Sequence, residues 1–203
     1  MPRLLHVIGS PRGALSRSGL VATAWLDALR VHRPDIAVDT LDPWREELPP
    51  LDAAAVAAKM AVTRGGTPDP AQRAAWDAVL AVVERFRAAD RYLFTVPMWN
   101  GGIPYRVKHY IDLIMQPGLL FTLDRATGYA GLLRNKRATV IYSAGIHAPG
   151  LPPAFGADYH ATYFDWWLRE TGVAEIDTIR LPPTGPGPDL EPVLARAREM
   201  AGR

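Results

Sequence analysis

Five short segments with strand character, each of five to seven residues, recur along the chain, and the first of them is a continuous apolar run. A continuous apolar run of this length is typical of a strand in a parallel sheet. The first run is followed at once by Gly9-Ser10-Pro11, and the third by Pro97. We therefore predict five strands, over residues 4–8, 37–41, 91–96, 138–142 and 175–181.

Segments with helical periodicity separate these runs. Between the first two, small or apolar residues repeat at the spacing of one helix face. These residues are Val21, Ala24, Trp25, Ala28 and Leu29. Similar patterns predict helices over residues 53–60, 71–89, 104–114, 159–171 and from 190 onward. Residues 119–133 are predicted to form a hairpin-like excursion, and 182–188 a rigid proline-rich stretch.

Strands that alternate with helices predict a parallel sheet with helices on both faces, because parallel strands need crossover connections. Five strands and about five helices favour a single α/β domain over residues 1–203. The expected architecture is a flavodoxin-like three-layer sandwich with strand order 2-1-3-4-5. In such sheets ligands bind beyond the carboxyl ends of the strands, where the winding reverses. We therefore expect function in the loops after strands one, three and four.

Composition narrows the possible chemistry. Of the 203 residues, 48% are hydrophobic and none is cysteine, which excludes disulfides, thiolate metal sites and thiol catalysis. The 23 basic and 21 acidic residues are spread along the chain, whereas a nucleic-acid binder would gather its basic residues. No signal peptide is evident and no apolar stretch approaches ~20 residues. We expect no resident metal, no nucleic-acid or membrane partner, and a cytoplasmic location.

The loop after the first predicted strand carries Ser10, Ser16, Arg17 and Ser18. It lacks both G-x-x-x-x-G-K-[ST] and G-x-G-x-x-G, so neither a nucleoside triphosphatase nor a classical dinucleotide domain is favoured. Hydroxyl groups, helix N-terminal N–H groups and an arginine suit one terminal phosphate. Alternatively, Ser16 and Ser18 only cap the helix. The position of the loop after strand one favours the phosphate.

The loop after the third predicted strand exposes the thioether of Met98, the indole of Trp99 and the amide of Asn100, followed by Gly101 and Gly102. A planar heteroaromatic ligand needs a flat apolar wall together with polar groups along its edge. Each residue alone could be a packing or turn residue. Their order and their place in the sheet favour a ligand.

The loop after the fourth predicted strand supplies the hydroxyl of Ser143, a glycine at 145 that allows close approach, and His147. A single histidine is more often a hydrogen-bonding residue than a catalyst. Both roles remain open for His147.

At these loops the chain resembles the FMN-dependent NADH-azoreductases, flavodoxin-like enzymes also described as NAD(P)H:quinone oxidoreductases. The most specific match is the segment PMWNGGIPYRVKHYID at 97–112, which is similar to the family pattern P-M-[YW]-N-x-x-[IP] and LK-x-[YF]-[IF]-D. Residues 117–122 and 131–132 and the serine loop are also similar.

The resemblance implies bound FMN and electron transfer from NAD(P)H to a quinone, and to an azo compound as a second acceptor, by a ping-pong cycle in one pocket. It implies that the phosphate is held by Ser10, Ser16, Arg17 and Ser18. The flavin ring would lie against Pro97, Met98, Trp99, Asn100 and Gly101. Its polar edge would be reached by Ser143, Ala144 and Gly145, with His147 on the substrate side. A homodimer is also implied.

The predicted helix at 159–171 has an aromatic face wider than one core stripe requires. Its members are Tyr159, Tyr163, Trp166 and Trp167. We expect part of this face to be buried and the rest to form a dimer surface, where aromatic residues are enriched. Residues 50–66 are expected to form part of a lid.

Two other function classes share this fold. A one-electron carrier resembling flavodoxin would usually present an acidic docking face, which this chain lacks. A flavin-free binding module is disfavoured by the intact serine loop and by Met98-Trp99-Asn100.

Overall fold

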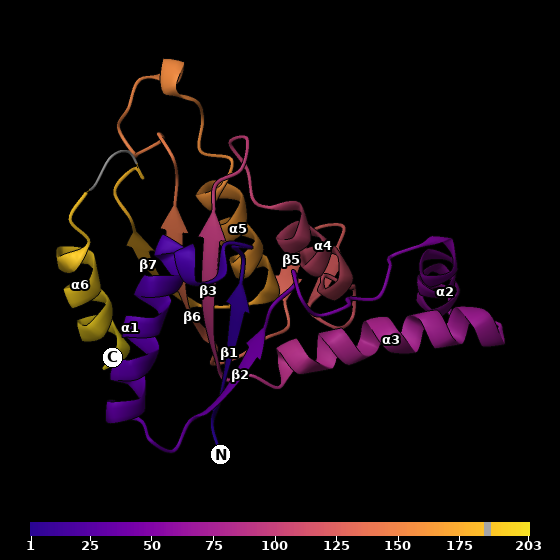
Figure 1. Ribbon diagram of the computed structural model, residues 1–203. Coiled ribbons are helices and arrows are strands. Elements are labelled where there is room, and N and C mark those ends of the chain that lie inside the picture. The colour runs from indigo at the N-terminus through magenta and orange to yellow at the C-terminus, as the bar shows by residue number, and fades with distance from the viewer. Residues whose placement is uncertain (185–187) are drawn as a thin grey trace.

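The predicted strands form one parallel sheet. The computed structural model describes residues 1–184 and 188–203. The sheet has the order β2-β1-β3-β6-β7, which matches the predicted 2-1-3-4-5 once the two hairpin strands are counted apart (Figure 1). Its strands are β1 (Arg3–Ile8), β2 (Ala37–Leu41), β3 (Arg91–Pro97), β6 (Arg137–Ser143) and β7 (Glu175–Arg180). Part of the predicted 182–188 stretch, residues 185–187, lies outside the described residues.

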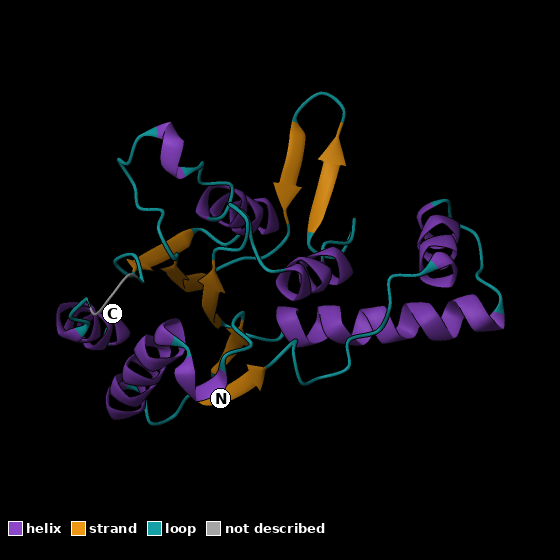
Figure 2. Cartoon of the chain, turned by 45° about the horizontal axis from the view of Figure 1, so that its top comes forward, coloured by secondary structure: helices purple, strands orange, loops and turns teal. Residues whose placement is uncertain are grey.

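Helices cover both faces of this sheet (Figure 2). The described residues contain six α-helices rather than about five. On one face lie α1 (Arg17–His32) and α6 (Glu191–Ala201). The other face carries α3 (Pro70–Arg87), α4 (Tyr105–Ile114) and α5 (Ala161–Thr171), and α2 (Ala53–Thr63) packs against α3.

The central strands are buried on both faces because successive side chains point to opposite sides of a strand. In β1, Leu4 packs beneath α1 while Leu5 joins the core under α3 to α5. In that larger core, the ring centroid of Trp167 lies 5.9 Å from that of Phe86 and 6.1 Å from that of Phe94. The edge strands β2 and β7 are only half-buried.

The helix starts follow local chemistry. Asp69 caps α3 by accepting the N–H of Gln72, whose side chain accepts the N–H of Asp69 in return, and Pro70 occupies the first turn. Such reciprocal capping satisfies two backbone donors that a helix N-terminus otherwise leaves without partners.

The predicted excursion at 119–133 is an antiparallel hairpin of β4 (Phe121–Asp124) and β5 (Gly128–Gly131). Its base is tied to α5 by a hydrogen bond from the Leu133 N–H to the Thr171 carbonyl. Residues 50–66, expected to form part of a lid, contain α2. This helix packs against α3, to the side of the sheet (Figure 1).

None of the helices within residues 1–184 and 188–203 combines the length and the apolar character that crossing a bilayer requires.

Parallel pairing brings the ends of three strands to one edge of the sheet. Ile8 lies opposite Thr95, and Pro97 lies opposite Ser143. Immediately after β1, the N–H of Gly9 donates to the Thr95 carbonyl at 2.9 Å and lies 3.1 Å from the Thr95 hydroxyl. A Cβ at Gly9 would stand 2.1 Å from that carbonyl oxygen. Only glycine permits this close crossing.

We expect Gly9→Ala to lower the free energy of unfolding by about 1–3 kcal/mol, because the added methyl group must push β1 away from β3. Urea unfolding followed by circular dichroism measures the change. Gly145→Ala is the matched control, since a Cβ there meets nothing within 4 Å. A Gly9→Ala protein as stable as the control would contradict the expectation.

Candidate functional site

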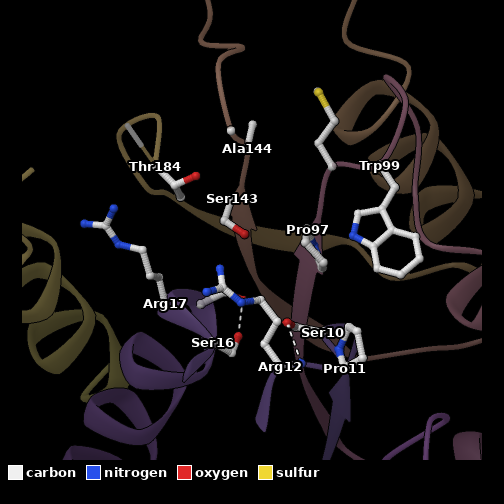
Figure 3. A pocket seen from close by; sticks show the side chains of 13 residues that line it. Ser10, Pro11, Arg12, Ser16, Arg17, Pro97, Trp99, Ser143, Ala144 and Thr184 are labelled. Atoms are coloured by element: carbon white, nitrogen blue, oxygen red, sulfur yellow. Dashed lines mark hydrogen bonds between the residues drawn. The ribbon is translucent and has the colours of Figure 1, made fainter. Parts of the chain in front are cut away.

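Loops from four strands surround one pocket at the carboxyl edge of the sheet (Figure 3). Its lining residues are Ser10, Pro11, Arg12, Ser16, Arg17, Ser18, Pro97, Met98, Trp99, Ser143, Ala144, Gly145 and Thr184. Ten of the twelve predicted cofactor-binding residues are therefore brought together. Asn100 and Gly101 do not line the pocket.

The serine loop presents hydroxyl groups and the N-terminus of α1 to this pocket. The Ser16 Oγ accepts the N–H of Gly19 at 3.1 Å, so Ser16 is the helix cap that the sequence left open as an alternative. The same oxygen lies 3.2 Å from the Ser18 Oγ. Capping leaves the pocket role intact, because the first N–H groups of a helix have no intrahelical acceptor and attract anions.

Two arginines border the serine loop. The Arg17 side chain stands beside the pocket and donates to the Pro188 carbonyl at 3.0 Å. Arg12, which the sequence analysis did not select, also lines the pocket. Its position directly after Ser10-Pro11 is the one feature of the sequence that could have predicted a place in the pocket. Both guanidinium groups make this end of the pocket positive.

The Asn100 and Gly101 backbone makes a tight turn. Trp99 and Gly102 exchange two backbone hydrogen bonds of 2.9 Å. Asn100 and Gly101 have φ values of 50° and 81°, the left-handed conformations that a type I′ turn requires. Asn and Gly are the residues that adopt this turn most readily. Their role here is to direct Trp99 and Met98 towards the pocket.

The Trp99 indole belongs to an aromatic cluster. Its ring centroid lies 5.3 Å from that of Trp44 and 6.5 Å from that of Tyr105. Trp44 follows β2, and its Nε1 donates to the Gly9 carbonyl at 3.2 Å. Trp44 was not predicted from the sequence, because the loop after the second strand was not among the three expected to carry function. The cluster supports the flat wall that Trp99, itself 38% exposed, presents.

His147 lies beside the pocket rather than in it. It lines a small adjoining cavity together with Met98, Ser143 and Ala144. Its Nδ1 is buried and has no hydrogen-bond partner among the described residues. The two cavities share these three residues, so His147 stays a neighbour of the site.

A buried histidine holds the end of β3 from behind. His160, 1% exposed, lies just before α5, and its Nε2 donates to the Val96 carbonyl at 2.6 Å. Burial lowers the pKa of His160 to about 4, so the ring is neutral near pH 7. The hydrogen bond fixes the strand one residue before Pro97.

Charged groups extend this support to β6 and β7. The Arg180 guanidinium lies 5.0 Å from the ring centroid of Tyr142 and pairs with Asp158 at 3.3 Å. Asp158 accepts the N–H of Ala161 and so caps α5. Tyr142 donates to Asp165 on the same helix. These contacts join the ends of two strands to α5.

Comparison with known proteins agrees with this architecture. Residues 2–203 match the model of the family described as Flavodoxin-like fold, and the chain belongs to this family. It is 46% identical over 184 residues to the FMN-dependent NADH:quinone oxidoreductase of Ruegeria pomeroyi, covering 91% of this chain and 90% of that one. It is 41% identical over 207 residues to FMN-dependent NADH:quinone oxidoreductase 2 of Burkholderia lata, covering 98% of each. The resemblance inferred from the loop motifs is thereby confirmed.

Solved structures share the fold. An FMN-dependent NADH-azoreductase from Bacillus anthracis in complex with FMN superposes with a TM-score of 0.85 at 20% identity, covering 100% of this chain and 96% of that one. An NAD(P)H:quinone oxidoreductase from Methanothermobacter marburgensis superposes with a TM-score of 0.76 at 20% identity, covering 100% of this chain and 98% of that one. At such identities the likeness shows the fold alone.

We expect the neutral state of His160 to make stability depend on pH. The unfolded chain takes up the proton near the ordinary pKa of about 6.5, whereas the folded chain takes it up only near 4. Stability is therefore full above pH 6.5 and falls as the pH drops towards 4. His160→Gln keeps an amide donor for Val96 but does not titrate.

Between pH 7 and pH 5 the free energy of unfolding should fall by about 2 kcal/mol less in this variant than in the wild type. Urea unfolding at the two pH values measures the difference. His6 is likewise buried, and burial lowers its pKa to about 4, so the variant should keep the part of the pH dependence that His6 contributes. Identical losses in both proteins would refute the role given to His160.

Proposed function

We propose that this protein is a cytoplasmic FMN-dependent oxidoreductase that transfers two electrons from NADH to a quinone, with azo compounds as further acceptors. The proposal makes residues 1–203 one FMN-binding domain. One observation supports it most. The loops after β1, β3 and β6, expected to contact the phosphate, the ring and the polar edge of a flavin, line a single pocket. Relatives at 46% and 41% identity are FMN-dependent NADH:quinone oxidoreductases, and reliance on NADH favours the cytoplasm.

The donor set fits the phosphate of FMN. Three hydroxyl groups and the N-terminus of α1 line one end of the pocket, and the Arg17 side chain stands beside it. A phosphate dianion accepts hydrogen bonds from all three kinds of donor, and those from charged donors are the stronger ones. Ser10, Ser16, Arg17 and Ser18 would hold this group.

The remaining walls fit a flat ring with one polar edge. Met98 and Trp99 provide apolar surface, while Ser143 and the backbone at 144–145 provide polar groups. Space is open beside Gly145, where a Cβ would touch nothing within 4 Å. When bound, the flavin would supply the electron transfer between NADH and the acceptor in a ping-pong cycle.

The residues around the ring would contribute position and electrostatics. Backbone N–H groups at Gly145 would stabilise negative charge at the polar edge of the ring. Trp99 and Met98 would exclude water from one side of it. His147, whose Nδ1 has no partner among the described residues, is a candidate to deliver a proton to the acceptor.

A second copy of the chain would complete this site. The pocket holds about 160 Å³, whereas ligand pockets usually hold about 300–1,000 Å³. A flavin would therefore project beyond the surface of one chain. Nearby, Ile103, Tyr159 and Trp166 line an open apolar depression, and the last two are 71% and 49% exposed. Of the predicted aromatic face, only Trp167 is fully buried, at 1% exposure.

The flavodoxin-like carrier and the flavin-free module are less well supported. An electron carrier docks on proteins through an acidic face, whereas Arg12 and Arg17 border this pocket. A module without flavin would have no use for the phosphate donors.

The central test is the binding and reduction of FMN. We expect the purified protein to bind one FMN per chain and NADH to bleach its yellow colour. Arg17→Ala should weaken FMN binding about tenfold by removing a charge-assisted hydrogen bond, and leave riboflavin binding unchanged. Flavin fluorescence titration measures both constants, with the exposed Arg73→Ala as control. Failure to bind FMN would reject the function, and equal effects on both flavins would reject the role of Arg17.

We expect light scattering to give twice the mass of one chain. Trp166→Glu should yield monomers with weakened FMN binding, because a carboxylate would be buried between the copies. Val31→Glu, at a 79% exposed position on α1, should remain dimeric. A monomeric wild type at working concentration would end the dimer proposal.

A further inference from the structure

A second cavity, of about 570 Å³, lies on the other side of the serine loop from the first pocket. It is lined by residues from the carboxyl ends of β1 and β3, from the serine loop and the start of α1, and from the segment that follows β2. Its volume is that of an ordinary small-molecule pocket. Ser10, Pro11 and Ser16 line both cavities, so only this loop separates them.

A buried polar group in the cavity wall has no partner in the chain. His6 of β1 lines the cavity, is 7% exposed, and its Nε2 makes no hydrogen bond with any described residue. Leaving a buried nitrogen unsatisfied costs about 1–3 kcal/mol. Burial lowers the pKa of His6 to about 4, so the ring is neutral and can both donate and accept. A ligand with hydroxyl groups or ring nitrogens is the kind of partner that this wall lacks.

The carboxylate of Asp42 stands at the end of β2, directly after Leu41. Its Oδ1 accepts the N–H of Trp44 at 3.0 Å, and its Oδ2 lies 3.5 Å from the Arg45 Nε. The side chain is 20% exposed, so it remains reachable. In β-α-β units that bind dinucleotides, an acidic residue near the end of the second strand accepts the ribose hydroxyl groups. The serine loop lacks the G-x-G-x-x-G fingerprint of those units, but Asp42 occupies the place of their acidic residue at the end of the second strand.

The other walls suit a nucleoside and its phosphates. Trp44 contributes an aromatic surface, and Thr23 adds a hydroxyl. Arg45 lines this cavity with its side chain 81% exposed, and Arg12 lines the first pocket. Gly13, the residue after Arg12, lies close to Arg45, since a Cβ there would be 4.0 Å from the Arg45 Nη2. Cations on both sides of the loop suit a bridging pyrophosphate.

We propose that this second cavity binds the adenosine half of NADH, with Asp42 accepting the ribose hydroxyl groups and Arg12 and Arg45 flanking the pyrophosphate. The proposal rests on the proposed function, because it needs the nicotinamide to reach the first pocket. It also sets the choice of donor: the Asp42 carboxylate repels the 2′-phosphate of NADPH, so NADH is preferred.

The first test measures binding without turnover. FMN-loaded protein is titrated calorimetrically with 5′-AMP and with adenosine 2′,5′-bisphosphate while the flavin absorbance is followed. We expect 5′-AMP to bind at least tenfold more tightly, and Asp42→Asn, which keeps an oxygen for the Trp44 N–H, to reduce the ratio below threefold. Arg45→Ala, at an exposed position that does not endanger folding, should weaken 5′-AMP at least threefold, and Arg73→Ala should not.

Three results would overturn the inference: no heat with 5′-AMP, release of FMN on its addition, or equal binding of both nucleotides by the wild type. Release of FMN would mean that the nucleotide occupies the serine loop instead.

The second test compares kcat/KM for NADH and NADPH. Asp42→Asn should shift the ratio at least tenfold towards NADPH. If NADH reduces the bound flavin but Asp42→Asn leaves the ratio unchanged, this inference fails and the proposed function stands. If FMN does not bind at all, the proposed function itself fails.

Discussion

The site depends on the register of three parallel strands. Because Ile8 pairs with Thr95 and Pro97 pairs with Ser143, the chain leaves β1, β3 and β6 at the same edge of the sheet. The contact between Gly9 and Thr95 sets how closely the first two loops approach. A shift by one residue in either pairing would turn every side chain of that strand to the opposite face. The pocket is therefore a consequence of the same ladder that builds the core.

Much of this arrangement could be predicted from the sequence. Five short segments with strand character predicted the strands, and their alternation with helices predicted the strand order, because right-handed crossovers leave few other topologies. The serine, Pro97–Trp99 and Ser143–Gly145 loops were selected by their position after particular strands. Contributions from residues outside those loops, such as Trp44 and Thr184, were missed. Nothing local distinguishes Trp44 from a core tryptophan, and its contact with Gly9 exists only across the sheet edge.

For Asn100 and Gly101, the role predicted from the motif differs from the role that the backbone geometry shows. The motif made them ligand contacts, whereas the backbone uses them to close a turn with positive φ at both positions. The two roles need not exclude each other, since a turn that must adopt this shape also fixes where Trp99 stands. Ser16 combines roles in the same way, as a helix cap and as a pocket wall. At a site built on helix and strand ends, residues that terminate an element are also those that face the ligand.

Polar contacts hold the ends of the strands that lead into the pocket. The end of β3 is held by His160 through a backbone carbonyl, and the ends of β6 and β7 by Tyr142, Asp165 and Arg180. An apolar contact would bury as much surface without fixing a direction, whereas a hydrogen bond to the Val96 carbonyl orients the peptide that leads into Pro97. His160 achieves this as a neutral group, and Arg180, which lines the same small cavity, is paired with Asp158. Arg12 and Arg17 line the pocket beside the serine loop, where a phosphate would neutralise their charge.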